Sequence, residues 1–238
     1  MLPIGISSTF CQPFEVGYYT GIGISVNNFD NDWNQDETHR RFISSDLSIN
    51  YRFLTNKKIK AFVGSGLMYS NNEYYHAIQS LEYSYYIQDV HFSQKHISVP
   101  IRLGIDVELF GDNSFGFQHD LRYNIAINNE DVLNGSETAI FGSLSYSYTL
   151  SNRTKSYLSN TFTMYLRTKI TNKLFLNTSV GYALIPITGD YDFETDQIQT
   201  STDQDTGSQI QKTGSYKFEN EDIRNNLVIF KIGLTSDL

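Results

Sequence analysis

The chain has 238 residues, of which 18 are lysine or arginine and 26 are aspartate or glutamate, so its formal net charge is −8. This balance argues against a nucleic-acid-binding protein, because phosphate contacts need clustered basic side chains. A single cysteine excludes a disulfide framework and a cysteine-based zinc site. No apolar run reaches the roughly 18 to 20 residues of a membrane-spanning helix, but a membrane β-barrel stays open, because its strands place apolar residues at every second position.

Residues 1–13 precede the first patterned segment and carry no charge. Two interpretations are open for them. They are either the remnant of a secretory signal peptide that lacks its basic start or a short disordered N-terminus. Residues 14–238 are expected to form a single domain.

The dominant pattern of the chain is an apolar residue at every second position, which predicts β-strands. In 95–109, for example, Ile97, Ile101 and Ile105 alternate with polar or small residues. Such strands of 12 to 15 residues exceed the five or six typical of soluble proteins and suit strands that cross a bilayer. The eight segments with this pattern are 14–27, 41–53, 59–71, 95–109, 115–127, 157–170, 174–187 and 225–236.

The connections between these segments alternate strictly between short and long. The short ones carry Asn, Gly, Asp and Ser, which are typical turn residues, and lie at 54–58, 110–114 and 171–173. The long ones lie at 28–40, 72–94, 128–156 and 188–224. This order predicts an all-β fold: an eight-stranded antiparallel up-and-down transmembrane β-barrel, located in the outer membrane, with short periplasmic turns and long extracellular loops.

Segment 138–150 also alternates like a strand, although it lies within a long connection. A ninth membrane strand would break the even strand number that such barrels have. We interpret the segment as part of a β-extension of the loop above the membrane. The alternative is a ten-stranded barrel whose tenth strand lies within 188–224.

The charges predict which face of the strands points inward. Twelve charged residues of the eight segments lie on the polar face, whereas only Arg41 and Lys95 lie on the apolar face. A charge at the lipid midplane costs about 2 to 4 kcal/mol, so the apolar face is expected to contact lipid. The opposite arrangement would be a soluble lipocalin-like barrel, with an apolar pocket lined by Ile97, Ile101, Ile105, Val228 and Phe230.

Several segments resemble a known family. They are the strand His96–Glu108, the turn Gly111-Asp112-Asn113, the segment Phe175–Tyr182 and the closing segment Asn226–Thr235. Together they are similar to the small outer-membrane β-barrel domain proteins of the Bacteroidota type, the PorT-like and small Omp barrels. The resemblance covers 14–238. It implies contact with outer-membrane lipid and with the outer-membrane assembly machinery, and it implies no single activity. The chain departs from many such barrels in ending on Leu238 in place of an aromatic residue.

Charged residues on the inward face predict a cluster of mixed sign. Simple pairing around 110–114 places Arg102 opposite Arg122 and Gly104 opposite Asp120, with Asp106 near Gln118. We interpret the cluster as a salt-bridged plug of the lumen, since eight strands leave little interior room. The alternative is a proton or ion path. The expected members are Arg102, Asp106, Glu108, Asp120 and Arg122.

The long connections suggest where partners bind. The connection 72–94 is rich in tyrosine, and rigid aromatic side chains suit binding surfaces, although they equally suit packing against the barrel. The candidate residues for an extracellular ligand or partner are Tyr74, Tyr75, Tyr83, Tyr85 and Tyr86. The acidic connection 188–224 is interpreted as solvated.

The histidines suggest no catalytic or metal site. His96 lies at the loop end of the polar face, and His119 lies on the apolar face near the short-turn side. Neither has a nucleophile in a recognisable spacing. We therefore expect no enzymatic activity, no cofactor and no metal. The predicted function is a structural or surface-interaction role through the loops. The alternatives are a small pore or transporter of small apolar molecules and the soluble lipocalin-like binding barrel.

Overall fold

A computed structural model describes the chain at residues 14–25, 38–55, 58–80, 85–109, 113–127, 130–138, 144–202, 209–223 and 226–238. These residues form twelve strands. Their bounds are β1 Phe14–Ser25, β2 Thr38–Thr55, β3 Ile59–Ser80, β4 Tyr85–Glu108, β5 Asn113–Ala126, β6 Glu130–Thr138, β7 Leu144–Thr154, β8 Tyr157–Lys169, β9 Leu174–Leu184, β10 Gly189–Thr202, β11 Gln209–Ile223 and β12 Leu227–Asp237. The described residues include no helix long and apolar enough to cross a membrane.

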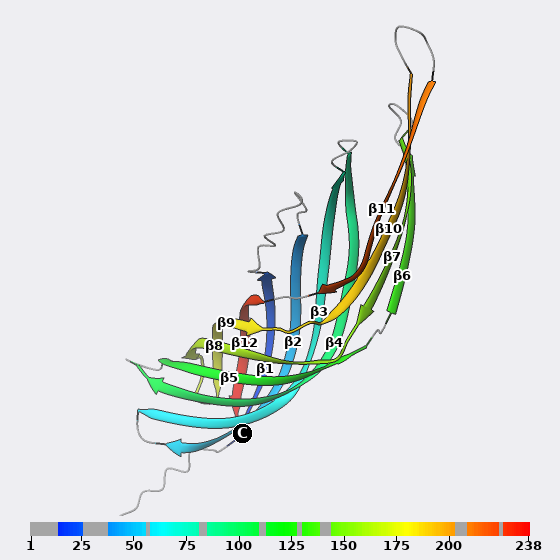
Figure 1. The fold of residues 1–238 in the computed structure, drawn as a ribbon. Coiled ribbons are helices and arrows are strands. Elements are labelled where there is room, and N and C mark those ends of the chain that lie inside the picture. The colour runs from blue at the N-terminus through cyan, green and yellow to red at the C-terminus, as the bar shows by residue number, and fades with distance from the viewer. Residues whose placement is uncertain are drawn as a thin grey trace, which may run out of the picture.

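Eight of the strands close into a barrel in the order β1-β12-β9-β8-β5-β4-β3-β2, and all neighbours are antiparallel. These are the eight segments that the sequence predicts, so the fold class is confirmed. The connection 72–94 was expected to be a loop, and this was wrong for most of its length. There β3 and β4 continue as a long hairpin beyond the barrel (Figure 1). The tyrosines of this segment suit strand pairing, because aromatic residues are enriched in β-strands.

The other four strands form a separate sheet in the order β11-β10-β7-β6, called the upper sheet below. It projects from the barrel on the side of the long connections (Figure 1). Strand β7 covers most of the segment 138–150, so the interpretation as a loop extension is confirmed. The ten-stranded alternative is wrong, because β10 pairs with β7 and β11 outside the barrel. One face of β10 is acidic and the other continues from Phe193 into Thr195, Gln197 and Gln199, so neither face is apolar along its length.

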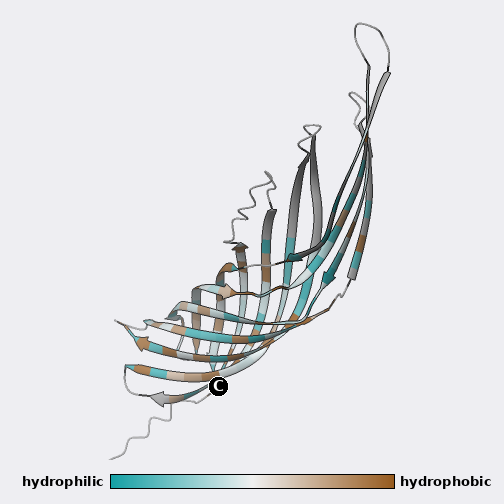
Figure 2. Cartoon of the chain, in the orientation of Figure 1, coloured by the Kyte–Doolittle hydropathy of each residue, from teal (hydrophilic) through white to brown (hydrophobic). Residues whose placement is uncertain are grey.

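The barrel has an apolar exterior and a polar interior, as the charges predict. Outward-facing Ile22 and Leu47 are 62% and 59% exposed, whereas inward-facing Arg102 and Asp120 are at most 2% exposed. Hydrophobic and hydrophilic positions alternate along the barrel strands (Figure 2). The lipocalin-like alternative is wrong, since its proposed pocket residues Ile97, Ile101, Ile105, Val228 and Phe230 lie on the outward face.

The lumen is narrow enough that several inward positions accept only glycine. A Cβ atom on Gly104 would lie 2.1 Å from the ring of Phe62, and one on Gly116 would lie 2.3 Å from the ring of Tyr165. Large aromatic side chains therefore fill the space that glycines leave on neighbouring strands. This packing is expected of an eight-stranded barrel, whose interior holds side chains and little else.

The register of the β4–β5 hairpin differs from the predicted one by two residues. Arg102 faces Asp120 and Gly104 faces Gln118, whereas Arg122 faces Pro100. The strands stay paired as far as Glu108 and Ser114, and the amide of Leu109 donates to the carbonyl of Asn113 at 2.9 Å. The turn is thus tighter than simple alternation suggests, and it sets an arginine directly against an aspartate.

Candidate functional site

One group of charged side chains, called the central cluster below, joins strands β2, β4, β5 and β12 across the interior of the barrel. Arg102 on β4 forms an ion pair with Asp46 on β2, and its Nε lies 3.6 Å from Oδ1 of Asp120 on β5. Asp120 also accepts from Arg122, with 2.6 Å between Oδ2 and Nη2. Lys231 on β12 lies 3.8 Å from Asp46. Arg102, Asp120 and Arg122, three of the residues that the sequence predicts as a cluster, therefore meet here.

A second group, the lower cluster, lies toward the short-turn end. Glu15 on β1 accepts from Arg52 at 2.8 Å and from Arg167 at 2.6 Å. Arg52 also contacts Asp106 at 2.7 Å, and Arg167 contacts Asp237 at 3.1 Å. Asp106 therefore belongs to this cluster, through Arg52, and its predicted place beside Arg102 and Arg122 needs correction. Asp106 lies four residues beyond Arg102 on β4, toward the turn, and the change of register places Asp120 and Arg122 two residues further from it.

Glu108, the fifth residue of the predicted cluster, is not part of either group. It is the last residue of β4, pairs with Ser114 beside the turn, and is exposed. Its place in the alternating pattern predicts an inward-facing side chain, but the lumen ends before this position. The sequence missed Glu15, Asp46, Arg52, Arg167 and Lys231 as members of the same network, although all of them lie on the polar face.

Taken together, the two clusters carry equal numbers of positive and negative charges. They contain five bases, Arg52, Arg102, Arg122, Arg167 and Lys231, and five acids, Glu15, Asp46, Asp106, Asp120 and Asp237. Buried charges are costly unless they are paired, and here each has at least one partner of opposite sign. Between the clusters lies a cavity of about 30 Å³, next to Tyr19 and Tyr165. It has room for about two water molecules, so the clusters plug the lumen.

An apolar layer lies inside the barrel on the side of the long connections. Its members are buried and pack against one another: Phe42, Met68, Ala183, Leu227 and Ile229. These residues lie at inward-facing positions that are otherwise mostly polar. They were not predicted as a group, because the alternating pattern identifies each strand correctly without them. The sequence signal for this layer is that large apolar residues recur at the inward-facing, mostly polar positions of β2, β3 and β12. The layer adds a second, water-excluding closure above the charges.

The base of the upper sheet is fastened to the barrel wall. Thr188, just before β10, donates from Oγ1 to Oε1 of Gln94 on β4 at 2.9 Å. Gln94 in turn donates to Asn152 on β7 at 3.5 Å. Nearby, a ring nitrogen of His96 lies 3.3 Å from the carbonyl of Lys155, and the ring packs edge-on against Tyr157. Because Gln94 and His96 are both fully buried, these contacts fix the sheet at a definite angle to the barrel.

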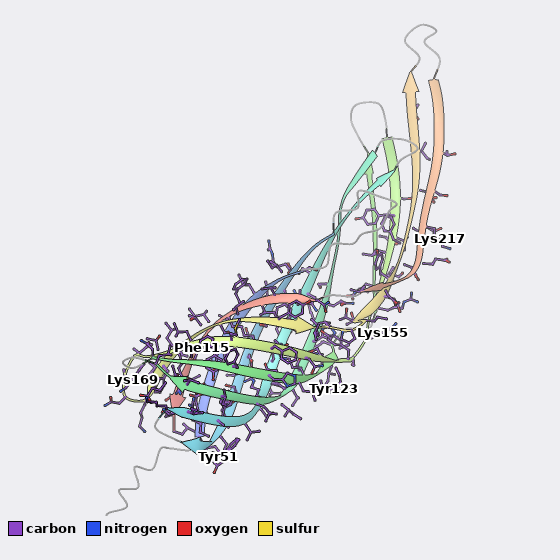
Figure 3. All side chains as sticks on the ribbon, turned by 60° about the vertical axis from the view of Figure 1, so that its left-hand side comes forward. Tyr51, Phe115, Tyr123, Lys155, Lys169 and Lys217 are labelled. Atoms are coloured by element: carbon purple, nitrogen blue, oxygen red, sulfur yellow. The ribbon has the colours of Figure 1, made fainter. Side chains whose placement is uncertain are left out.

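An ionic contact completes this base. Asp190, the second residue of β10, forms ion pairs with Arg153 on β7 and with Lys155, the latter at 2.7 Å. Burial raises the pKa of the Asp190 carboxyl, but the hydrogen bonds and charges of Lys155 and Arg153 outweigh that effect and hold the pKa below its usual range. Asp190 is therefore charged at neutral pH and holds β7 and β10 together. In Figure 3, Lys155 lies where the barrel meets the upper sheet.

The tyrosines proposed to bind a ligand lie on or beside the β3–β4 hairpin. Tyr74 and Tyr75 are in β3, and Tyr85 and Tyr86 are in β4, but their side chains are outside the part that the structure describes. Tyr83 lies outside the described residues altogether. Their role as a binding surface stays a prediction.

The two histidines with described side chains have no carboxylate partner. His96 contacts a main-chain carbonyl, and His119 lies 3.1 Å from the side-chain oxygen of Asn160. The described residues also contain no group of three or more His, Cys, Asp or Glu side chains placed to hold a metal ion.

The exterior belongs to a barrel that spans a membrane. Aromatic residues mark both ends of the wall, with Tyr51 and Phe115 toward the short turns and Tyr123 toward the upper sheet (Figure 3). A closed barrel with an apolar outer band, aromatic girdles and long connections at one end is the outer-membrane type. The chain is therefore an integral outer-membrane β-barrel.

Of three comparisons with known proteins, only the one with solved structures gives likenesses for this chain. No protein-family model matches the chain, and no curated protein sequence matches it. Among solved structures, Neisserial surface protein A has 10% identity and a TM-score of 0.45 over 94% of this chain and 97% of that one. The outer membrane protein OprG from Pseudomonas aeruginosa has 10% identity and a TM-score of 0.46, with 95% of each chain covered. The outer membrane protease OmpT from Escherichia coli has 9% identity and a TM-score of 0.42, with 96% and 98% covered. At these scores the likenesses assign no activity to the chain.

Proposed function

We propose that this protein is a non-conducting surface barrel that holds the upper sheet in a fixed orientation outside the cell, where the sheet and the adjoining hairpin contact a partner. The observation that carries the proposal is the fastening of the sheet through Thr188, Gln94 and Asn152. Satisfied buried polar networks make a structure rigid, so these contacts hold the sheet in one orientation relative to the barrel.

The plugged lumen supports the same function. A pore for polar solutes would need a continuous water path, whereas here paired charges, an apolar layer and a cavity of about 30 Å³ occupy the interior. The assignment to the PorT-like, Bacteroidota type belongs to this proposal too, as does assembly by the outer-membrane machinery. We propose no enzymatic activity for it.

Two measurements on the full chain test the proposal. An epitope inserted between Thr202 and Gln209, the ends of β10 and β11, is expected to bind antibody on intact cells. The purified barrel is expected to be electrically silent in a planar bilayer. Labelling only after permeabilisation, or stable channels from a correctly folded preparation, would contradict the proposal and favour the pore.

The proposed contact of the upper sheet with a partner is tested by comparing two strains. Cells that carry the full chain are compared with cells whose β10–β11 hairpin is shortened beyond Phe193 and Phe218, which face each other. We expect a loss of autoaggregation and of adherence to glass, with an unchanged amount of heat-modifiable barrel in the membrane. Equal aggregation and adherence in both strains would argue against this role and for a purely structural one.

A further inference from the structure

A polar residue, His119, lies on the lipid-facing side of the barrel at mid-height. It alternates in β5 with inward-facing residues, and its neighbours on the same face, Phe117 and Leu121, are exposed. Phe115 and Tyr123, which mark the two ends of the wall in Figure 3, are each four residues away. At about 3.3 Å per residue each lies about 13 Å along the strand. The predicted position near the short turns therefore needs correction, because His119 is about halfway across.

His119 does not stand alone in the hydrocarbon. A ring nitrogen lies 3.1 Å from Oδ1 of Asn160 on β8, and the ring stacks on Phe162 with 4.7 Å between centroids and 20° between planes. A neutral imidazole has one donor and one acceptor, and an amide has two donors besides its oxygen. The pair therefore has hydrogen-bonding capacity left for a third group. Polar side chains inside a membrane are costly, and those that persist commonly have a function.

His119, although not its partner Asn160, lines a groove on the outer face of β4, β5, β8 and β9. One wall of the groove is a row of residues that face each other on adjacent strands and includes His119 and Phe162. The other wall is the next row, which includes Phe117 and Met164. The groove has a volume of about 710 Å³, and apart from His119, Gln118 and Thr163 the residues that line it are glycine, apolar or aromatic. Volumes of about 300 to 1,000 Å³ with few polar groups are typical of small-molecule sites.

We propose that this groove binds a neutral, mostly apolar molecule that carries one carbonyl or hydroxyl group and enters from the membrane. The apolar part would lie against Phe117, Phe162 and Met164, and the polar group would hydrogen-bond to the ring of His119, which Asn160 holds in position. The site is separate from the plugged lumen and from the upper sheet. It is independent of the proposed surface role, so either can fail without the other.

A small molecule fits this groove better than a second copy of the chain. A two-fold dimer brings the same surface of both subunits together, so that surface must be complementary to itself. Two copies of one groove would face each other and enclose a void lined by His119, which an interface packed like a protein interior does not tolerate. The shape therefore favours an occupant that fills the groove.

The test uses the full chain in lipid nanodiscs and an alkyne-tagged benzophenone, a neutral aromatic ketone that cross-links to nearby C–H bonds under ultraviolet light. We expect saturable labelling of peptides from β5 and β8. His119→Leu and Asn160→Leu are expected to reduce it about fivefold or more, the factor that losing one hydrogen bond commonly produces. Leucine offers more C–H bonds than histidine, so a reduction cannot reflect lower reactivity toward the probe.

The matched control is Thr20→Leu, which removes a polar group from the exposed lipid face of β1, away from the groove. It is expected to leave labelling unchanged, and heat-dependent gel mobility confirms that every variant is folded. Labelling spread over all eight strands, or equal in His119→Leu, would overturn the proposal, because the probe would then only partition into lipid around the barrel. Cross-linking of two chains through His119→Cys, in a Cys11→Ser background at low protein-to-lipid ratio, would also overturn it in favour of a dimer interface.

Discussion

The hydroxyl of Thr188 donates to the side-chain oxygen of Gln94 at 2.9 Å, across 94 positions of sequence, and joins the upper sheet to the barrel wall. Thr188 and Gln94 are both completely buried. The barrel and the sheet are thus coupled at a point where neither strand alternation nor hydrophobic pattern requires a contact.

Removing this hydroxyl should loosen the sheet and leave the barrel intact. In Thr188→Val, Gln94 loses a buried partner, which costs about 1 to 3 kcal/mol. We expect faster proteolysis within β10 and β11 in outer-membrane vesicles, with unchanged heat-dependent mobility of the protected barrel fragment. Thr188→Ser, which keeps the hydroxyl, is the control and should behave like the parent. Equal proteolysis of Thr188→Val and the parent would show that the contact does not hold the sheet.

The central cluster should be sensitive to the loss of its arginine. Arg102→Ala leaves Asp46 and Asp120 buried without their shared cation, a change that costs about 3 to 5 kcal/mol for buried ion pairs. We expect the urea midpoint of unfolding in detergent to fall sharply. The five changes Asp46→Asn, Arg102→Met, Asp120→Asn, Arg122→Met and Lys231→Met remove all charges of the central cluster together and should recover most of the loss. If Arg102→Ala alone were neutral, the cluster would not be structural.

The ionic base of the upper sheet should make it sensitive to acid. The pKa of Asp190 is lowered in the folded protein, so its ion pairs with Arg153 and Lys155 stabilise the sheet fully above the unfolded-state pKa of about 4. That contribution is lost as the pH falls through the lower, folded-state value. Proteolysis by pepsin, followed between pH 5 and pH 2, should therefore accelerate below about pH 4 in the parent.

Asp190→Asn provides the comparison for the acid experiment. It lacks the titrating group, so its sheet should already be loosened at neutral pH and should show a smaller further change on acidification. A parent and a variant with parallel pH profiles would assign the acid sensitivity to other carboxylates of β10, such as Asp192 and Glu194.

The packing of the lumen predicts a specific rescue. A side chain at Gly104 would overlap the ring of Phe62, because a Cβ atom there already lies 2.1 Å from it. Gly104→Val should prevent formation of the heat-modifiable barrel, since overpacking of a dense interior forces backbone shifts. Gly104→Val combined with Phe62→Ala should restore the mobility shift. Failure of both variants would indicate that Gly104 is needed for its backbone and not for space.

Part of this architecture is local and was predictable. Alternation along Ile97, Ile101 and Ile105 identifies both the strand and its lipid-facing side, because a strand directs successive side chains to opposite faces. The strict order of short and long connections then determines the strand number and the direction in which loops project. The polar identity of Asp120 and Arg122 likewise places them inside, since lipid does not tolerate charge.

Other features depend on how strands meet, which no single segment encodes. A shift of two residues in the β4–β5 register keeps every residue on its predicted face, yet it replaces an Arg102–Arg122 pairing by Arg102–Asp120. The same shift places Asp120 and Arg122 two residues further from Asp106, which pairs with Arg52 of the lower cluster. The residues that complete both clusters come from β1, β2, β8 and β12, which closure of the barrel brings together.

The sequence by itself predicted the barrel, its membrane, its eight strands and its polar interior, because each follows from residue period and from the cost of charge in hydrocarbon, whereas the pairing of β10 outside the barrel was needed to exclude ten strands. Only the tertiary structure decided the two ionic clusters, the apolar layer around Phe42, the fastening of Thr188 to Gln94 and the groove beside His119. These depend on register and on barrel closure, which place side chains from distant strands within a few ångströms of one another. Period-two alternation is unchanged by any shift of two residues, so it carries no information about those contacts.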